Sequence, residues 1–144
     1  MKVSDAMTSD VKLANPEETI QQAAKTMATL DAGVLPVGDN GQLVGMVTDR
    51  DIAIRGVALG KGPDTKVREV MTEDIKYCFD DQTIEEVTRN MADIQVRRLP
   101  VLNRDKRLVG ILSLGDVAIN RESKVSGDAL RGISRPGGKH SQTA

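Results

Sequence analysis

The sequence repeats itself at a spacing of 64 residues, and this repeat limits the possible folds more than any other feature. Between positions 2 and 37, identical residues recur 64 positions later at Lys2/Lys66, Val3/Val67, Met7/Met71, Thr8/Thr72, Asp10/Asp74, Lys12/Lys76, Thr19/Thr83, Ile20/Ile84, Met27/Met91, Ala28/Ala92, Pro36/Pro100 and Val37/Val101. One extra residue then changes the spacing to 65, at which Leu43/Leu108, Val44/Val109, Gly45/Gly110, Asp51/Asp116 and Ala53/Ala118 match. Two copies with so long a period predict a pseudo-symmetric pair of units rather than a solenoid.

Each copy is predicted to contain the elements β-α-β-β-α in this order. A short strand is expected first (11–13 and 75–79), followed by a helix that begins with a capping box, Thr19 to Gln22 and Thr83 to Glu86. Two apolar strands joined by a polar turn come next (34–37 with 43–48, and 99–102 with 108–113), and a second helix begins near Asp49 and near Leu114. We expect residues 1–10 and the linker at 59–66 to pack onto the opposite repeat.

Composition excludes several classes of function. The formal net charge is −1, and Tyr77 and Phe79 are the only aromatic residues, so neither a basic field nor stacking rings favour nucleic acid. The single cysteine, Cys78, fits a reducing compartment. The first residues lack a signal-peptide pattern, and no apolar run approaches the roughly 20 residues of a membrane span. A cytoplasmic protein without a membrane partner is therefore expected.

The sequence offers no recognisable catalytic arrangement. Its only histidine, His140, lies in a Gly-, Ser- and Lys-rich C-terminal stretch, and Cys78 lies in an apolar strand where an inert core thiol is expected. No Cys/His set suggests zinc, and no GxGxxG or P-loop motif is present. We therefore expect no catalytic residues, no metal site and no required cofactor.

Motifs in both copies resemble those of the CBS family. Each copy has a Met-Thr pair, a Leu-Pro-Val strand and a segment of the form Gly-h-h-(Thr/Ser)-x-x-Asp, where h is apolar; these are Met7-Thr8, 35–37 and 45–51, then Met71-Thr72, 99–101 and 110–116. The resemblance covers about residues 1–122 and is greatest to stand-alone bacterial CBS pairs of the hypoxic-response type. It implies an α/β (α+β) fold of two βαββα repeats packed through their sheets, with motifs at 1–64 and 65–122 and a flexible tail at 123–144.

The resemblance also implies a ligand and its site. Members of the family bind adenosine derivatives such as AMP, ADP, ATP, NAD or S-adenosylmethionine between the repeats. In this sequence the corresponding positions are Thr8, Val11, Val34, Pro36, Thr48, Arg50, Asp51, Thr72, Ile75, Arg98, Pro100, Ser113 and Asp116. Thr48 and Ser113 would bind phosphate at the start of a helix, Asp51 and Asp116 would accept hydrogen bonds from ribose hydroxyls, and Arg98 would bind phosphate.

A structural interpretation competes with each of these roles. Ser/Thr-x-x-Asp at a helix start is also a capping arrangement that needs no ligand, and Arg98 could be a solvated arginine at a strand end. The first copy has Val34 in place of Arg98, so the copy containing Arg98, Ser113 and Asp116 is the better candidate for a charged phosphate. Gly115 either lets a ligand approach the backbone or only weakens the helix.

Three functions remain in competition. The first is a regulatory module that senses an adenine nucleotide and passes the signal to its own dimer or to a protein target. The second is a structural dimerisation module with vestigial clefts. The third, an enzyme fragment, rests on the occurrence of CBS pairs within IMP dehydrogenase, and it is disfavoured because no catalytic domain accompanies the pair.

A homodimer is expected because apolar residues at 52, 54, 57, 117 and 119 would otherwise be partly exposed.

Overall fold

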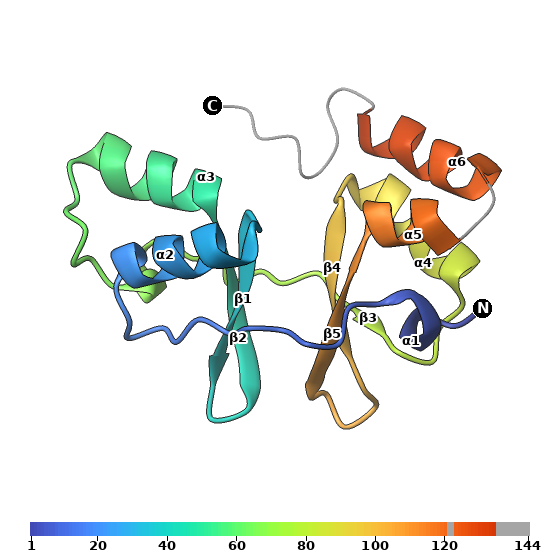
Figure 1. Ribbon diagram of the computed structural model, residues 1–144, viewed down its shortest axis with the longest axis horizontal. Helices are drawn as coiled ribbons and strands as arrows, with labels where there is room; N and C mark the ends of the chain where they lie inside the picture. The colour runs from blue at the N-terminus through green and yellow to red at the C-terminus, as the bar shows by residue number, and fades with distance from the viewer. Residues whose placement is uncertain (121–122, 135–144) are drawn as a thin grey trace. The chain divides into compact units, whose positions relative to one another are not determined.

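The computed structural model describes residues 1–120 and 123–134, which form two compact units (Figure 1). One unit spans Lys12–Ile75, and the other combines Met1–Val11 with the chain from Lys76 onward. The first contains α2 (Ile20–Leu30), β1 (Val34–Asp39), β2 (Gln42–Thr48), α3 (Asp49–Asp51), the π-turn η1 (Ile52–Gly56) and the 3₁₀ turns η2 (Val57–Leu59) and η3 (Val67–Glu69). The second contains α1 (Val3–Ala6), β3 (Cys78–Phe79), α4 (Ile84–Ile94), β4 (Arg98–Leu102), β5 (Leu108–Ser113), α5 (Leu114–Asn120) and α6 (Ser123–Ser134). The predicted α+β class is confirmed, and the order of a helix, two strands and a further helix recurs in both units.

The Met-Thr pair that opens each copy packs in the unit formed by the other copy. Thr8 exchanges two backbone hydrogen bonds of 2.9 Å with Ile111 of β5, and Thr72 exchanges bonds of 2.9 and 2.8 Å with Met46 of β2. The motif glycines make this close approach possible. A Cβ atom on Gly110 would lie 2.6 Å from Met7 Sδ, and one on Gly45 would lie 2.8 Å from Met71 Sδ. The expectation that residues 1–10 pack onto the opposite repeat is therefore confirmed.

The linker behaves differently from the expectation. Residues 59–66 belong to the unit of the first repeat, where Ile20 N donates to Thr65 O at 2.8 Å and Gln21 N donates to Pro63 O at 3.1 Å. The prediction that the linker packs onto the second repeat was therefore wrong, because these backbone bonds attach it to the start of α2.

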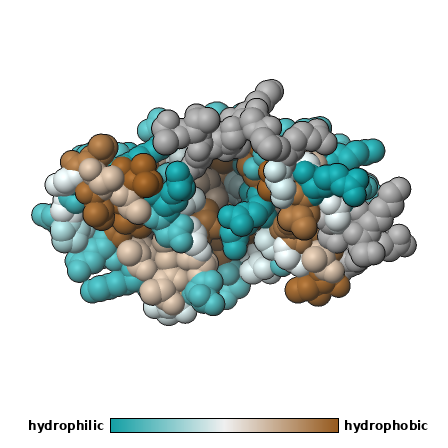
Figure 2. Space-filling model, turned by 90° about the horizontal axis from the view of Figure 1, so that it is seen from above, coloured by the Kyte–Doolittle hydropathy of each residue, from teal (hydrophilic) through white to brown (hydrophobic). Residues whose placement is uncertain are grey.

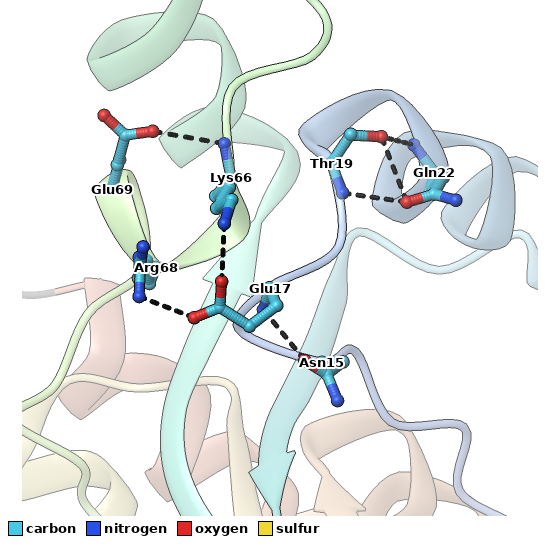
Figure 3. A network of polar contacts seen from close by, with 7 residues as sticks. All are labelled: Asn15, Glu17, Thr19, Gln22, Lys66, Arg68 and Glu69. Atoms are coloured by element: carbon cyan, nitrogen blue, oxygen red, sulfur yellow. Dashed lines mark hydrogen bonds and ion pairs between the residues drawn. The ribbon is translucent and has the colours of Figure 1, made fainter.

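An ion-pair cluster reinforces this attachment (Figure 3). The Glu17 carboxylate lies 2.7 Å from Lys66 Nζ and 2.5 Å from Arg68 Nη1. The hydrogen bond from Lys66 is the largest cause that lowers the pKa of Glu17 below its usual value; desolvation opposes it, and the charges of Arg68 and Lys66 lower the pKa further. The cluster thus joins the segment before α2 to the end of the linker and the start of η3.

Two antiparallel hairpins form the centre of the units. Strands β1 and β2 pair from Val34↔Thr48 to Asp39↔Gln42, and Asn40 and Gly41 have φ angles of 51° and 78°, as a two-residue type I′ turn requires. Strands β4 and β5 pair from Arg98↔Ser113 to Leu102↔Leu108.

The expected first strands are shorter than predicted. Cys78–Phe79 pairs in parallel with β4, whereas at 11–13 no strand forms and the equivalent pairing is a single bridge, Ala14↔Val37.

Each unit has its own aliphatic core. The helices α2 and α4 begin at the predicted Thr caps. At α2, Thr19 and Gln22 form the reciprocal pair of a capping box. At α4, Thr83 accepts from Glu86 N, but the Glu86 carboxylate accepts from Gln82 Nε2. Buried apolar side chains of the helices meet those of the strands, in the first unit at Ile20, Ala23, Met27, Leu35, Val37 and Val47, and in the second at Ile84, Val87, Met91, Leu99, Val101, Leu112 and Val117. Val117 is therefore core, and the expectation that it is partly exposed was wrong.

The C-terminal stretch is helical where the structure describes it. Residues 123–134 were expected to be part of a flexible tail, but Ser123–Ser134 forms α6, which packs on α4 and α5. Ala129 is buried, and Gly132 lies so close to α4 that a Cβ atom there would be 2.4 Å from Ala92 Cβ. The glycines that suggested a loop thus include one required for helix packing. The remainder of the predicted tail, 135–144 with His140, lies outside the described residues.

Candidate functional site

Three of the predicted residues of the second unit, Arg98, Pro100 and Ser113, share one face of its sheet. Leu99, Val101 and Leu112 are buried in the core of the unit. Side chains alternate between the two faces of a strand, so Arg98 and Pro100 of β4 and Ile111 and Ser113 of β5 lie on the opposite face.

Pairing places these residues in two rows. Arg98 is directly opposite Ser113, and Pro100 is opposite Ile111, which is also bridged to Thr8 on the other side. The structure therefore brings together Thr8, Arg98, Pro100 and Ser113, which are separated by up to 105 positions in the sequence.

Asp116 joins this group through the start of α5. Its Oδ2 accepts from Ser113 N at 2.9 Å, and Ser113 Oγ accepts from Asp116 N at 3.0 Å. Leu114 N donates to Arg97 O at 2.8 Å, which ties the helix start to the residue before β4. Arg98 is exposed, whereas Ser113 and Asp116 are half-buried. A cation, a hydroxyl and a carboxylate therefore lie together at one end of the hairpin.

The first unit repeats this arrangement with different side chains. Val34 is opposite Thr48, Pro36 is opposite Met46, and Met46 is bridged to Thr72. Thr48 and Asp51 form the same reciprocal pair, with N···O distances of 3.0 and 2.9 Å. Asp51 is 6% exposed, and its Oδ1 lies 3.9 Å from Arg55 Nε. This carboxylate is thus more enclosed by its own unit than Asp116.

The local charge differs between the copies. Arg97 and Arg98 of the second copy correspond to Gly33 and Val34, and Leu114 and Gly115 correspond to Asp49 and Arg50. A Cβ atom on Gly33 would lie 3.0 Å from Asp49 Oδ2, so in the first unit a carboxylate occupies the space beside the position equivalent to Arg97. Arg97 and Asp49 were not among the predicted site residues, although the Arg97-Arg98 doublet was a signal for the former.

The capping interpretation of Ser/Thr-x-x-Asp is confirmed in both copies. Each aspartate uses Oδ2 to accept from the backbone N–H of the capping residue. An ionised carboxylate has acceptor capacity for about four hydrogen bonds on two oxygens, so capping and ligand binding are compatible.

The other predicted residues occupy less defined positions. Val11 and Ile75 are both half-buried. Val11 lies three residues after Thr8 and ends the N-terminal segment of the second unit, and Ile75 lies three residues after Thr72 and is the last residue of the first unit. Arg50 is an exposed residue of α3. Gly115 is exposed, and a Cβ atom there would be 3.6 Å from Ser113 Oγ, which leaves space beside the start of α5.

In the described part of the chain, Cys78 is the thiol to consider as a nucleophile, and His, Cys, Asp and Glu are the side chains to consider as metal ligands. Burial, with a smaller contribution from Asp80, raises the pKa of Cys78 to about 12, so its thiol is protonated at neutral pH. Within residues 1–120 and 123–134, no three His, Cys, Asp or Glu side chains are grouped to hold a metal ion.

The CBS domain model matches the sequence twice, at residues 3–56 and 67–121. The chain belongs to the CBS domain family. The two matches contain the two Ser/Thr-x-x-Asp segments and both hairpins, so the geometry described above is that of a CBS pair.

Two curated relatives support the assignment to a CBS pair. The CBS domain-containing protein YhcV of Bacillus subtilis is 43% identical over 133 residues, covering 92% of this chain and 94% of the relative. Hypoxic response protein 1 of Mycobacterium tuberculosis is 40% identical over 116 residues, covering 79% and 80%. The predicted similarity to CBS pairs of the hypoxic-response type is thus confirmed.

Solved CBS structures share the fold, and some of them contain ligands. Hypoxic Response Protein I with two coordinated zinc ions has a TM-score of 0.76 at 37% identity, covering 85% of this chain and 100% of that one. CBSX2 in complex with AMP has a TM-score of 0.73 at 28% identity, covering 83% and 94%. The CBS domain pair of MJ0100, in complex with 5-methylthioadenosine and S-adenosyl-L-methionine, has a TM-score of 0.74 at 27% identity, covering 83% and 94%.

None of the helices in residues 1–120 and 123–134 has the length and apolar character needed to cross a bilayer.

Proposed function

We propose that this CBS pair is a regulatory module that binds an adenosine phosphate at the Arg98–Ser113 end of its second hairpin. The observation that supports this most directly is the register of β4 and β5, which sets Arg98 opposite Ser113 with Asp116 capped onto the same serine. Phosphate would lie near Arg98 and Ser113, and the ribose hydroxyls would donate to Asp116.

The chemistry of these side chains suits such a ligand. A guanidinium offers a planar set of N–H donors that bind phosphate in pairs, and a serine hydroxyl adds a further donor. Asp116 accepts from Ser113 N through Oδ2 in the cap, and an ionised carboxylate has acceptor capacity for further hydrogen bonds, such as those from ribose hydroxyls. The three groups thus match the phosphate and the ribose of one small molecule.

Structural relatives support the adenosine part of the proposal. AMP is bound by CBSX2, and 5-methylthioadenosine and S-adenosyl-L-methionine are bound by the MJ0100 pair. Adenosine is common to all three ligands, whereas only AMP has a phosphate. We propose that backbone and apolar groups near Thr8, Val11 and Pro100 contact the base in the second unit, and that their counterparts Thr72, Ile75 and Pro36 have the equivalent role in the first unit.

The first copy is proposed to bind a less anionic ligand. Val34 stands at the position of Arg98, and Asp49 adds a carboxylate two residues before Asp51. Of the first-copy residues that correspond to Arg97, Arg98, Leu114 and Gly115, Arg50 is the one cation. Arg50, together with Arg55 at 3.9 Å from Asp51, only balances the two aspartates, whereas Arg97 and Arg98 outnumber Asp116 in the second copy. We therefore expect AMP, ADP, ATP or NAD to bind first through the second copy.

The structural module remains the second candidate. Its support is that both Ser/Thr-x-x-Asp pairs are complete capping arrangements without a ligand. This candidate expects no nucleotide binding and a function in self-association alone.

We further propose that the protein acts as a cytoplasmic homodimer and has no enzymatic activity. Nucleotide binding would change the population of a dimer or of a surface for a protein target. Purified protein should therefore turn over neither nucleotides nor nicotinamide cofactors. Turnover that persists through purification and disappears with Arg98→Val would contradict this part of the proposal.

The test of the site is titration calorimetry with AMP, ADP, ATP, NAD, S-adenosylmethionine and adenosine. Arg98→Val introduces the residue that the first copy has at this strand position, so folding should be preserved. Loss of charge-assisted hydrogen bonds, each about 1.5–3 kcal/mol, should weaken AMP binding by roughly tenfold to a hundredfold and affect adenosine less.

The matched control is Arg89→Ala, which removes an exposed arginine from α4 in the same unit. It should leave AMP affinity unchanged. Equal affinity of wild type and Arg98→Val for AMP would refute the site, and a complete lack of binding by wild type would favour the structural module.

A further inference from the structure

The helix α6 is attached to the rest of the second unit through two contacts with the end of α4. A Cβ atom on Gly132 would lie 2.4 Å from Ala92 Cβ and 2.9 Å from Ala92 Cα, so the closest approach of α6 requires glycine. Gln95 Nε2 donates to Gly132 O at 3.0 Å and to Ile133 O at 3.3 Å. The last carbonyls of a helix lack intrahelical partners, so the amide of Gln95 caps α6 from the neighbouring helix.

Gln95 also begins the segment that leads to Arg98. It follows α4 in the left-handed region, with a φ of 57°, and only two residues separate it from the arginine. Both of these residues are held by backbone hydrogen bonds: Val96 N donates to a carbonyl of α4 at 3.1 Å, and Arg97 O accepts from Leu114 N at 2.8 Å. The residue that caps α6 is therefore connected to the proposed phosphate-binding arginine by a short, fixed stretch of chain.

The other side of the proposed site is reached through α5. The helix α6 packs on α5 as well as on α4 (Figure 1). The first turn of α5 carries Asp116, which exchanges hydrogen bonds with Ser113, and the next residue, Val117, is fully buried. Thus α6 contacts both helices that lead to the site, namely α4, which precedes Arg98, and α5, which contains Asp116.

Within the described residues, the contacts that hold α6 have no counterpart in the first unit. Ala28, which is equivalent to Ala92, is exposed. Asp31, which is equivalent to Gln95, has a carboxylate that accepts hydrogen bonds when ionised and cannot donate to the carbonyls of a helix. The attachment of a further helix is therefore specific to the copy that contains Arg98.

The helix after the capping pair also differs between the units. In the first unit α3 is followed by the π-turn η1, and Ile54, Val57 and Leu59 are 50%, 68% and 68% exposed. Figure 2 shows hydrophobic side chains gathered on the surface of this unit. In the second unit α5 is a continuous α-helix over Leu114–Asn120 and has α6 packed on it.

We propose that α6 is a brace for the nucleotide site of the second copy, because its docking holds Arg98 and Asp116 in the arrangement that binds an adenosine phosphate. This inference rests on the proposed function, since it concerns the regulation of the same site. Coupling of this kind is reciprocal, so docked α6 strengthens nucleotide binding and bound nucleotide stabilises docked α6. When α6 is displaced, the binding-competent arrangement is less populated, and the apparent dissociation constant rises in inverse proportion.

The test compares two glycines of α6. Gly132→Gln places a side chain against Ala92, whereas Gly127→Gln adds the same side chain where no atom lies within 4 Å of the new Cβ. Amide hydrogen exchange of 127–134 reports docking of α6, exchange of β4 and β5 reports folding of the unit, and titration calorimetry reports affinity for AMP. Gln95→Asn shortens the capping amide from the side of α4 without adding volume, and asparagine tolerates the left-handed conformation.

We expect Gly132→Gln to remove amide protection from α6 while β4 and β5 keep theirs, and to weaken AMP binding roughly tenfold, as is usual for coupled sites. Gln95→Asn should act in the same direction to a smaller extent, and Gly127→Gln should match wild type. In the reverse direction, saturating AMP should slow exchange of α6 in wild type, and Arg98→Val should lose this response at the same AMP concentration. A helix that only stabilises the fold would not respond to AMP in this way.

The proposal is overturned if Gly132→Gln and Gln95→Asn expose α6 but keep wild-type affinity for AMP, or if Gly127→Gln weakens binding equally. It is also overturned if α6 stays protected in both variants, because the two contacts would then not hold it. In each of these cases Arg98→Val still weakens AMP binding if the proposed function is correct. A wild-type protein that binds no AMP would refute the proposed function itself and the brace with it.

Discussion

The glycine and the Met-Thr pair of the CBS motif have a joint structural explanation in this chain. At Gly110, a Cβ atom would lie 2.6 Å from Met7 Sδ and 2.7 Å from Thr8 O, and Gly45 has the same relation to Met71 and Thr72. These residues lie far apart in the sequence, yet each glycine makes room for the segment that completes the edge of its sheet. Sequence reasoning identified the residues of the motif but not this contact.

Substitution of Gly110 tests this explanation. Gly110→Ala should reduce the free energy of unfolding by about 1–3 kcal/mol, because overpacking displaces the segment around Thr8. The measurement is urea unfolding monitored by circular dichroism.

Gly115→Ala is the matched control for Gly110→Ala. Its Cβ atom would meet only Ser113 Oγ, at 3.6 Å, and alanine favours the helical conformation of α5. It should leave stability unchanged or slightly increased. Equal destabilisation by both substitutions would show that the close contact at Gly110 is not the cause.

At the scale of elements, the linker shows how polar contacts decide which unit a segment joins. Backbone bonds from Ile20, Gln21 and Val67 attach residues 63–67 to the region around α2, and Glu17 adds its ion pairs with Lys66 and Arg68. The side chains involved are exposed, and similar ones occur throughout the sequence. Composition could therefore identify a linker but not its place of attachment.

The Glu17 cluster predicts a pH-dependent contribution to stability. Lys66 and Arg68 lower the pKa of Glu17 in the folded protein. A carboxyl with a depressed folded pKa stabilises the fold above its unfolded pKa of about 4.3, and this contribution is lost as pH falls through the lower folded value. The difference in thermal midpoint between wild type and Glu17→Gln should thus be largest near neutral pH and vanish in acid.

Ionic strength and a control variant check the origin of this effect. Exposed ion pairs are screened, so added salt should also reduce the difference. Glu73→Gln removes another exposed carboxylate and should lack this pH profile. A Glu17→Gln effect that is independent of both pH and salt would contradict the electrostatic account.

The helix α6 was missed for a reason specific to its packing. Gly127 and Gly132 lower helix propensity and suggested a tail, yet Gly132 is the residue that allows α6 to approach Ala92. Tertiary packing overrides local propensity here. A single sequence contains no sign of this contact before the position of α4 is known.

At the scale of the whole molecule, the internal repeat was sufficient to predict the α+β class, both hairpins, and the helices that follow Thr19 and Thr83. It also predicted that residues 1–10 join the opposite repeat, but it did not show that Met7 and Thr8 lie against Gly110, or Met71 and Thr72 against Gly45. The candidate site was predictable in its residue types: Arg98, Ser113 and Asp116 do lie together. Their partner from the N-terminal segment became clear only from the bridge between Thr8 and Ile111.

The central claim is that an adenosine phosphate binds where Arg98 faces Ser113, and a crystal structure of the protein with AMP tests it most directly. The account predicts the phosphate within hydrogen-bond distance of the Arg98 guanidinium and Ser113 Oγ, with a ribose hydroxyl donating to the Asp116 carboxylate. AMP bound with its phosphate beside Val34 and Thr48 of the first copy, or away from both hairpins, would contradict the account.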